Sequence, residues 1–224
     1  MKKNKTVVAI VPVREGSERV PNKNFRNFFK NETLLHLKIK QLKKQKLIDK
    51  IYVSSNSKKA KKIANELGVN FVNRSNYMCS QKAKLHEYNS YMLKSIPGNP
   101  HVIWTMVTSP LFDEYDKSIK KYFANINKGF DSLITTIKYN DFLIDHNARP
   151  LNCSFGVWHL LTQELQKQFQ ITGSVYIAKK SDQLKWNYWF GPRPFMLNIK
   201  KYQSVDIDDK EDFKIAQILY EKYF

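Results

Sequence analysis

Apolar and polar positions along the chain predict short buried strands that alternate with amphipathic helices. Val7–Val13 is a continuous β-branched apolar run, which is typical of a strand buried on both faces. Thr33–Leu47 then carries leucine and isoleucine at near-helical spacing, with Thr33 as a suitable N-cap. Further strands are expected at 50–54, 69–72, 101–106 and 132–139, and further helices at 56–68, 87–95, 115–126 and 209–223.

This order of elements indicates the fold class. A β-α-β-α-β succession argues for a parallel sheet with right-handed crossovers, and therefore for an α/β protein with a doubly wound, mostly parallel sheet flanked by helices. The 224 residues are enough for one well-buried domain, which we place at 1–224. Between residues 140 and 170 the periodic pattern weakens.

A polar loop follows the first strand directly and carries the first candidate chemistry. It holds three cations, Arg14, Arg19 and Lys23, together with Gly16. Ligands of open α/β sheets bind at the carboxyl ends of strands, so this loop predicts a site for a polyanion such as a triphosphate. Gly16 lets backbone N–H groups approach closely, and the cations can bind phosphate oxygens. No Walker A or Gly-x-Gly-x-x-Gly pattern is present, so the residues alone leave a solvated basic loop open.

A second candidate cluster lies near the end of the sequence. Asp206 and Asp208 alternate on an expected extended segment, so both carboxylates point to one face. Two hard carboxylates suit Mg²⁺, which retains waters and bridges to phosphates. The alternative is an acidic helix N-terminus, which we assign to Asp209 and the acidic residues after it. The helix that follows is expected to bury Ile215, Ile218 and Leu219.

Charge and cysteine content narrow the function classes. The net charge is +18, but only six of the 38 basic residues are arginine, and the lysines, Lys38 among them, are spread over expected solvated helix faces. No nucleic-acid recognition motif accompanies this charge, so we expect no nucleic-acid partner. No apolar run is long enough to span a bilayer, and Val7–Val13 does not fit a signal peptide. Cys79 and Cys153 have no paired spacing, which favours reduced thiols and a cytoplasmic protein.

The first loop resembles the signature of the acylneuraminate (CMP-sialic acid) cytidylyltransferase family, Pro-Ala-Arg-x-Gly-Ser-Lys-Arg-x-Pro-x-Lys-Asn. The positions that match are Pro12, Arg14, Gly16, Ser17, Arg19, Pro21, Lys23 and Asn24. The family's Asp-Ile-Asp-x-x-x-Asp-Phe pattern fits residues 206–213 in full, and Thr108–Leu111 and Gly173–Ile177 resemble two further family segments. The chain is therefore identified as a divergent member.

The resemblance implies a nucleotide-diphospho-sugar transferase-like, Rossmann-like fold. It also implies a reaction of CTP with a sialic-acid-like nonulosonate to give a CMP-sugar and pyrophosphate for surface glycan synthesis. A homodimer follows as well, with a dimerisation and substrate-covering extension at about 140–172. Catalytic roles fall to Arg14, Lys23, Asp206 and Asp208, with the two aspartates as Mg²⁺ ligands. The implied nucleotide-binding residues are Arg14, Gly16, Ser17, Arg19, Lys23, Asn24, Arg74 and Ala83. The sugar-binding candidates are Gln163, Gln170, Gly173 and Arg193.

Several positions depart from the family pattern. Glu18 stands where the family has a lysine, and Leu85 stands near a serine expected beside the cytosine. Gln170 replaces an arginine that grips the sugar carboxylate, and Arg193 is the candidate replacement cation. These departures leave open a transferase of the same fold for another acidic acceptor or nucleotide. A non-catalytic nucleotide-binding relative is the other alternative.

Overall fold

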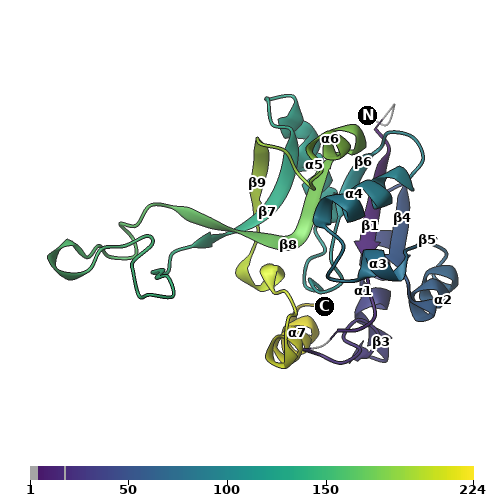
Figure 1. The fold of residues 1–224 in the computed structure, drawn as a ribbon, viewed down its shortest axis with the longest axis horizontal. Helices are drawn as coiled ribbons and strands as arrows, with labels where there is room; N and C mark the ends of the chain where they lie inside the picture. Colours follow the sequence, from purple (N-terminus) through teal and green to yellow (C-terminus); the bar gives the residue numbers. More distant parts are fainter. Residues whose placement is uncertain (1–4, 18) are drawn as a thin grey trace.

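The central sheet lies in the middle of a computed structural model that describes residues 5–17 and 19–224 (Figure 1). Among the described residues, seven strands form this sheet in the order β5-β4-β1-β6-β8-β7-β9. β8 runs antiparallel to both of its neighbours and the other strand pairs are parallel, which confirms the predicted mostly parallel sheet. The strands are β1 (Val7–Pro12), β4 (Lys50–Ser55), β5 (Asn70–Asn73), β6 (His101–Trp104), β7 (Ser132–Tyr139), β8 (Gln168–Lys179) and β9 (Pro194–Asn198).

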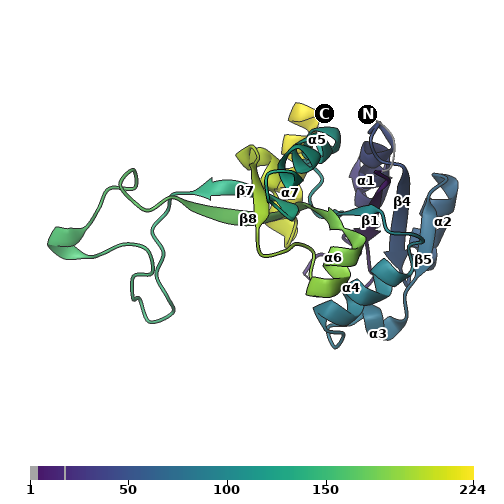
Figure 2. The ribbon, with the colours of Figure 1, turned by 90° about the horizontal axis from the view of Figure 1, so that it is seen from above.

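Helices cover both faces of the sheet, which completes the doubly wound fold (Figure 2). The residues of α1, α5 and α7 pack into one apolar core, while those of α4 and α6 pack into a second core on the other face. The helices are α1 (Leu34–Lys43), α2 (Lys58–Glu66), α3 (Asn76–Cys79), α4 (Leu85–Lys94), α5 (Tyr115–Ile126), α6 (Lys180–Trp186) and α7 (Lys210–Tyr223). Two short 3₁₀ turns, η1 (Gly156–Trp158) and η2 (Lys201–Ser204), and a small hairpin of β2 (Asn27–Phe29) and β3 (Glu32–Thr33) complete the elements.

The helix starts follow the expected capping chemistry. The Thr33 hydroxyl accepts from the backbone N–H of His36, as predicted for α1, and the Asp209 carboxylate caps α7. The inward face predicted for α7 is wrong for Ile215 and Ile218, which are exposed, whereas Leu219 is half-buried and packs against the core. From the cap at Asp209, the positions that face the core are instead Phe213, Ala216 and Tyr220.

The prediction that Lys38 lies on a solvated helix face is also wrong. Its side chain is completely buried under α1, on the stripe that also carries Leu34, Leu35 and Leu42. In a helix, residues three and four apart share a face, so a lysine flanked by leucines at these spacings faces the core. The spacing of the leucines around Lys38 thus indicates burial, although lysine is usually an exposed residue.

A long arm, residues 140–167, projects from the body between β7 and β8 (Figures 1 and 2). Its base is fixed where Tyr139 pairs with Gln168. The extension expected at about 140–172 thus comprises this arm and residues 168–172, which are the first residues of β8. Large apolar side chains of the arm are exposed, with Val157 at 92% and Trp158 at 77%. Over the described ranges, no helix is long and apolar enough to cross a membrane.

Candidate functional site

A pocket of about 350 Å³ lies at the carboxyl edge of the sheet, where the loops after β1 and β6 meet. These two parallel strands are neighbours, yet the chain passes through β4 and β5 before it returns to β6. Such a reversal of strand order leaves a crevice in which ligands of open α/β sheets bind. The lining residues include Arg14, Gly16, Ser17, Arg19, Lys23, Asn24, Arg74, Gln81, Tyr88, Met106, Val107, Thr108 and Asp208.

The loop after β1 forms one wall of the pocket. Gly16 adopts a φ of +79°, a left-handed conformation that suits glycine. The Asn24 amide closes the loop by donating to the Arg14 carbonyl at 3.0 Å. The Arg14 guanidinium in turn donates to the Cys79 carbonyl of α3 at 3.0 Å. The loop is thus tied both to itself and to the neighbouring helix. Glu18 lies outside the described residues.

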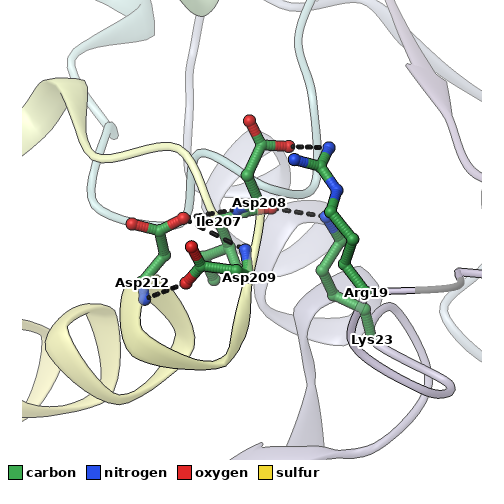
Figure 3. Close-up of polar contacts among 6 residues, drawn as sticks. All are labelled: Arg19, Lys23, Ile207, Asp208, Asp209 and Asp212. Carbon is green, nitrogen blue, oxygen red and sulfur yellow. Dashed lines mark hydrogen bonds and ion pairs between the residues drawn. The ribbon is translucent and has the colours of Figure 1, made fainter.

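Lys23 joins this loop to the C-terminal segment. Its side chain is 9% exposed, and its ammonium donates to the Ile207 carbonyl (Figure 3). Burial lowers the pKa of Lys23, and the nearby Asp208 and Asp206 carboxylates oppose that shift. A largely buried cation in the wall of a pocket is suited to an anionic ligand, because solvent screens its attraction little there.

The acidic segment forms the facing wall. The Ile207 backbone N–H donates to the Thr108 carbonyl at 2.9 Å, which fixes the segment against the loop after β6. The Asp208 carboxylate points to Arg19, with Oδ1 2.8 Å from Nη2 (Figure 3). Asp206 lies beside Gly173, where an added Cβ would come within 3.4 Å of its Oδ2. Gly173 therefore leaves the space that the Asp206 carboxylate occupies.

The donor set here fits a divalent cation. Asp206 and Asp208 offer exposed carboxylate oxygens on either side of the buried Ile207. Among the described residues, no group of three or more His, Cys, Asp or Glu side chains could hold a metal by itself. Two carboxylates with the remaining positions left to water and phosphate oxygens are the usual arrangement for Mg²⁺. A metal at this place would depend on the nucleotide for part of its coordination.

Arg74 supports the floor of the pocket. It is 6% exposed, and its Nη2 donates to the Val13 carbonyl at 2.6 Å and to the Ser54 carbonyl at 3.0 Å. Its guanidinium lies 5.0 Å from the ring centre of Tyr88, which also lines the pocket. Arg74 thus ties together the carboxyl ends of β1 and β4. Tyr88 and Gln81 were absent from the sequence prediction, since no local motif marks them.

Four predicted site residues lie away from this pocket in the chain. Ala83 is on the turn before α4 and does not line the cavity, whereas Gln81 does. Gln163 is exposed on the arm, and Gln170 is exposed on β8, paired with Ile137. Arg193 lies at the amino edge of the sheet, where its backbone N–H donates to Asp131 at 2.9 Å. The structure brings together the loop after β1 and Asp208 in one pocket, but not these four residues. Asp206 and Gly173 lie beside each other and do not line the cavity.

Comparison with known proteins adds an independent observation. A sequence model of the Cytidylyltransferase family matches residues 8–185. N-acylneuraminate cytidylyltransferase of Streptococcus agalactiae is 24% identical over 220 residues, which are 92% of this chain and 51% of that protein. The chain thus spans about half the length of the first curated relatives it matches. Pseudaminic acid cytidylyltransferase of Campylobacter jejuni is 24% identical over 95% of both chains.

Solved structures share the fold. A CMP:2-keto-3-deoxy-manno-octonic acid synthetase complexed with CTP aligns with a TM-score of 0.71 at 10% identity, covering 98% of this chain and 100% of the other. A 4-diphosphocytidyl-2C-methyl-D-erythritol synthase of Anaerococcus prevotii aligns with a TM-score of 0.67 at 15% identity, covering 97% of this chain and 96% of the other. At these identities the likeness concerns the fold alone.

Proposed function

The chain belongs to the cytidylyltransferase family, and from this membership we propose that it transfers the cytidylyl group of CTP to an acidic, sialic-acid-like sugar. The products are a CMP-sugar for surface glycan synthesis and pyrophosphate. Named relatives that act on N-acylneuraminate and on pseudaminic acid support this acceptor class.

One observation carries the proposal: the basic loop after β1 and the acidic C-terminal segment face each other across a single pocket. A triphosphate needs cations for its oxygens, and Arg14, Arg19 and Lys23 line this cavity. Asp208 lies on the opposite wall, within reach of the same phosphates. The volume of about 350 Å³ is in the range of small-molecule sites.

In the proposed reaction, the anomeric hydroxyl oxygen of the sugar bonds to the α-phosphorus of CTP. The bond from that phosphorus to the bridging oxygen of the β-phosphate breaks, pyrophosphate leaves, and the hydroxyl proton passes to solvent. Arg14, Arg19 and Lys23 hold the triphosphate and stabilise the negative charge that develops on the leaving group. Ser17, Gly16 and the other loop residues shape the cradle around the phosphates.

Asp206 and Asp208 would hold Mg²⁺ together with phosphate oxygens. When bound there, the ion supplies a positive charge that offsets the charge growing on the transferred phosphate. Arg19 and Asp208 form an ion pair in the structure, which places the Arg19 guanidinium beside this proposed metal ligand.

The arm fits a homodimer in which one copy covers part of the other's site. Its exposed Val157 and Trp158 are the kind of large apolar side chains that protein interfaces bury. In this proposal, the exposed Gln163 on the arm and Gln170 near its base contact the sugar in such an assembly. The free Cys79 and Cys153 fit a reducing compartment, so we place the reaction in the cytoplasm.

Pyrophosphate release tests the proposal. The purified chain is mixed with Mg²⁺ and each of the four ribonucleoside triphosphates, against N-acetylneuraminate, its 5,7-diamino relatives and the eight-carbon acid Kdo. We expect release with CTP and a nonulosonate. Asp208→Ala should abolish it, because the metal loses one of its two carboxylate ligands, whereas Glu211→Gln changes an exposed acid of α7 and should leave it intact.

Other outcomes separate the alternatives. Release with another nucleotide or with Kdo would favour a transferase of the same fold with a different substrate. CTP binding without turnover on any acceptor would favour a non-catalytic relative. If neither binding nor release occurs with any triphosphate, the proposed function is wrong.

A further inference from the structure

A completely buried lysine lies directly behind the pocket wall. The Lys38 ammonium, on α1, donates to the Ser109 carbonyl at 2.8 Å and to the Tyr115 hydroxyl at 2.7 Å. A longer contact of 3.4 Å reaches the Phe112 carbonyl. All three N–H donors of the ammonium therefore have acceptors within the protein interior. Two of the acceptors, Ser109 and Phe112, lie in the loop after β6, and Tyr115 is the first residue of α5.

A second side chain of α1 contacts the same loop. Gln41, one turn further along, donates from its amide nitrogen to the Pro110 carbonyl at 2.6 Å. The loop carbonyls of residues 109, 110 and 112 thus point at α1 and accept side-chain hydrogen bonds instead of backbone ones. Tyr115 extends this network to the end of β6, because its hydroxyl lies 2.9 Å from Thr105 Oγ1. Contacts with α1 and Tyr115 therefore fix both ends of the loop on the side away from the pocket.

The other side of this loop faces the site. Met106, Val107 and Thr108 line the pocket. The Thr108 carbonyl accepts from the Ile207 N–H at 2.9 Å, between the two candidate metal ligands. A continuous series of contacts therefore runs from Lys38 through Ser109 and Thr108 to Ile207.

We propose that Lys38 is a positioning residue for the metal and nucleotide site: its ammonium fixes the 105–112 loop, and that loop sets the place of Asp206 and Asp208. The expected effect of Lys38 on CTP binding rests on the proposed function. Its expected effect on the Ile207 backbone is independent of that function. The ligand whose binding it controls is a divalent cation held with a nucleoside triphosphate.

The burial of the Lys38 ammonium supports a positioning role. Desolvation lowers the pKa of Lys38 to about 7, and the carboxylates of Asp113 and Asp206 partly oppose this shift. A buried charge adds little to stability compared with an apolar side chain of the same size, but it can fix one arrangement of its acceptors. Three carbonyl and hydroxyl oxygens that all need a donor define one loop conformation; an apolar residue would leave them unpaired.

The test compares Lys38→Met with the matched control Lys40→Met, which removes an exposed lysine two residues away on the same helix. Two quantities are measured: hydrogen exchange of the Ile207 amide by NMR, and CTP affinity by calorimetry with and without Mg²⁺. In Lys38→Met we expect Ile207 protection to fall by roughly tenfold or more. The Mg²⁺-supported CTP affinity should fall by roughly tenfold, with a smaller change in metal-free affinity.

Lys40→Met should match the wild-type chain in both measurements. A Lys38→Met protein that keeps Ile207 protection and Mg²⁺-supported affinity within about twofold of wild type overturns the inference. If the wild-type chain binds no CTP, the proposed function fails, and Ile207 exchange alone decides the role of Lys38. If Lys38→Met does not fold, the same measurements on Gln41→Leu decide, since that variant removes the neighbouring contact to the loop.

Discussion

The pocket edge of the sheet and the arm of residues 140–167 differ in which side chains are buried. Polar groups are buried and paired at the pocket edge, whereas large apolar groups are exposed on the arm. At the pocket edge, polar groups find partners inside the chain: Lys23 bonds to the Ile207 carbonyl, and Arg74 to two strand ends. On the arm, Val157 and Trp158 are large apolar groups left in water. Apolar surface in water is unfavourable, and we propose that a second copy of the chain buries these side chains of the arm. The residues that line the pocket come from one chain.

The largest effect is expected from a substitution that removes the contact between the two pocket walls. Lys23→Met removes the cation that lines the pocket and the donor to the Ile207 carbonyl. We expect kcat/KM for CTP to fall by roughly 100- to 1,000-fold, the usual cost of losing a group that stabilises developing charge. Steady-state pyrophosphate assays measure this loss. Lys210→Met, an exposed lysine at the start of α7, is the control and should retain activity; equal loss in both variants would contradict a specific role.

A second experiment tests the burial of Lys38 through the pH dependence of protein stability. In the folded protein the pKa of Lys38 is about 7, well below its value of 10.5 in the unfolded chain, because burial disfavours the charge. Between these values the unfolded chain binds more protons, so stability rises as pH rises. From pH 7 to 10, the free energy of unfolding of wild type should gain about 3 kcal/mol relative to Lys38→Met. Urea titrations at several pH values measure it; parallel curves for the two proteins would contradict the assignment.

The third experiment addresses the arm. Trp158→Glu puts a charge where we propose an apolar interface, and the dimer dissociation constant should rise roughly tenfold or more. Sedimentation at several concentrations gives that constant. Ile218→Glu is a matched control, since Ile218 is also exposed but lies on α7 of the body. A wild-type chain that stays monomeric would refute the assembly, and equal effects of both variants would place the interface elsewhere.

The smallest expected effect concerns the ion pair across the pocket mouth. Arg19 and Asp208 are both more than half exposed, so solvent screens their attraction. Arg19→Gln should change the free energy of unfolding by less than about 0.5 kcal/mol. CTP binding should nevertheless weaken, because the triphosphate loses a cation. Thermal unfolding and calorimetry together check this; a large loss of stability would mean that the pair is structural.

Local sequence patterns predicted most of the architecture. α5 and β7 have the predicted bounds, and Thr33 caps α1 as its side chain chemistry suggests. These elements are determined by periodicity and capping within a few neighbouring residues. Local patterns could not predict that β8 runs antiparallel to its neighbours, because the pairing of a strand depends on partners far away in the sequence.

The site divides in the same way. The residues of the phosphate loop and Asp208 line one pocket, and a local signature marked each of them. No local motif marks Tyr88, and the leucine spacing around Lys38 indicates its burial but not its contacts with the loop after β6. Ile215 and Ile218 show the converse error, where hydrophobic identity suggested a core position that the helix phase does not provide. Spacing predicted the elements well, but not every side chain's environment.

The Lys23–Ile207 hydrogen bond joins residues 184 positions apart. During translation, the loop after β1 emerges early, long before the segment that faces it. A growing chain therefore carries this loop through the synthesis of the 184 positions that separate Lys23 from Ile207 before the facing carboxylates are made. The two walls meet only after Asp206 and Asp208 have left the ribosome, at roughly 5–20 residues per second. The proposed triphosphate site therefore forms only once both segments have been synthesised.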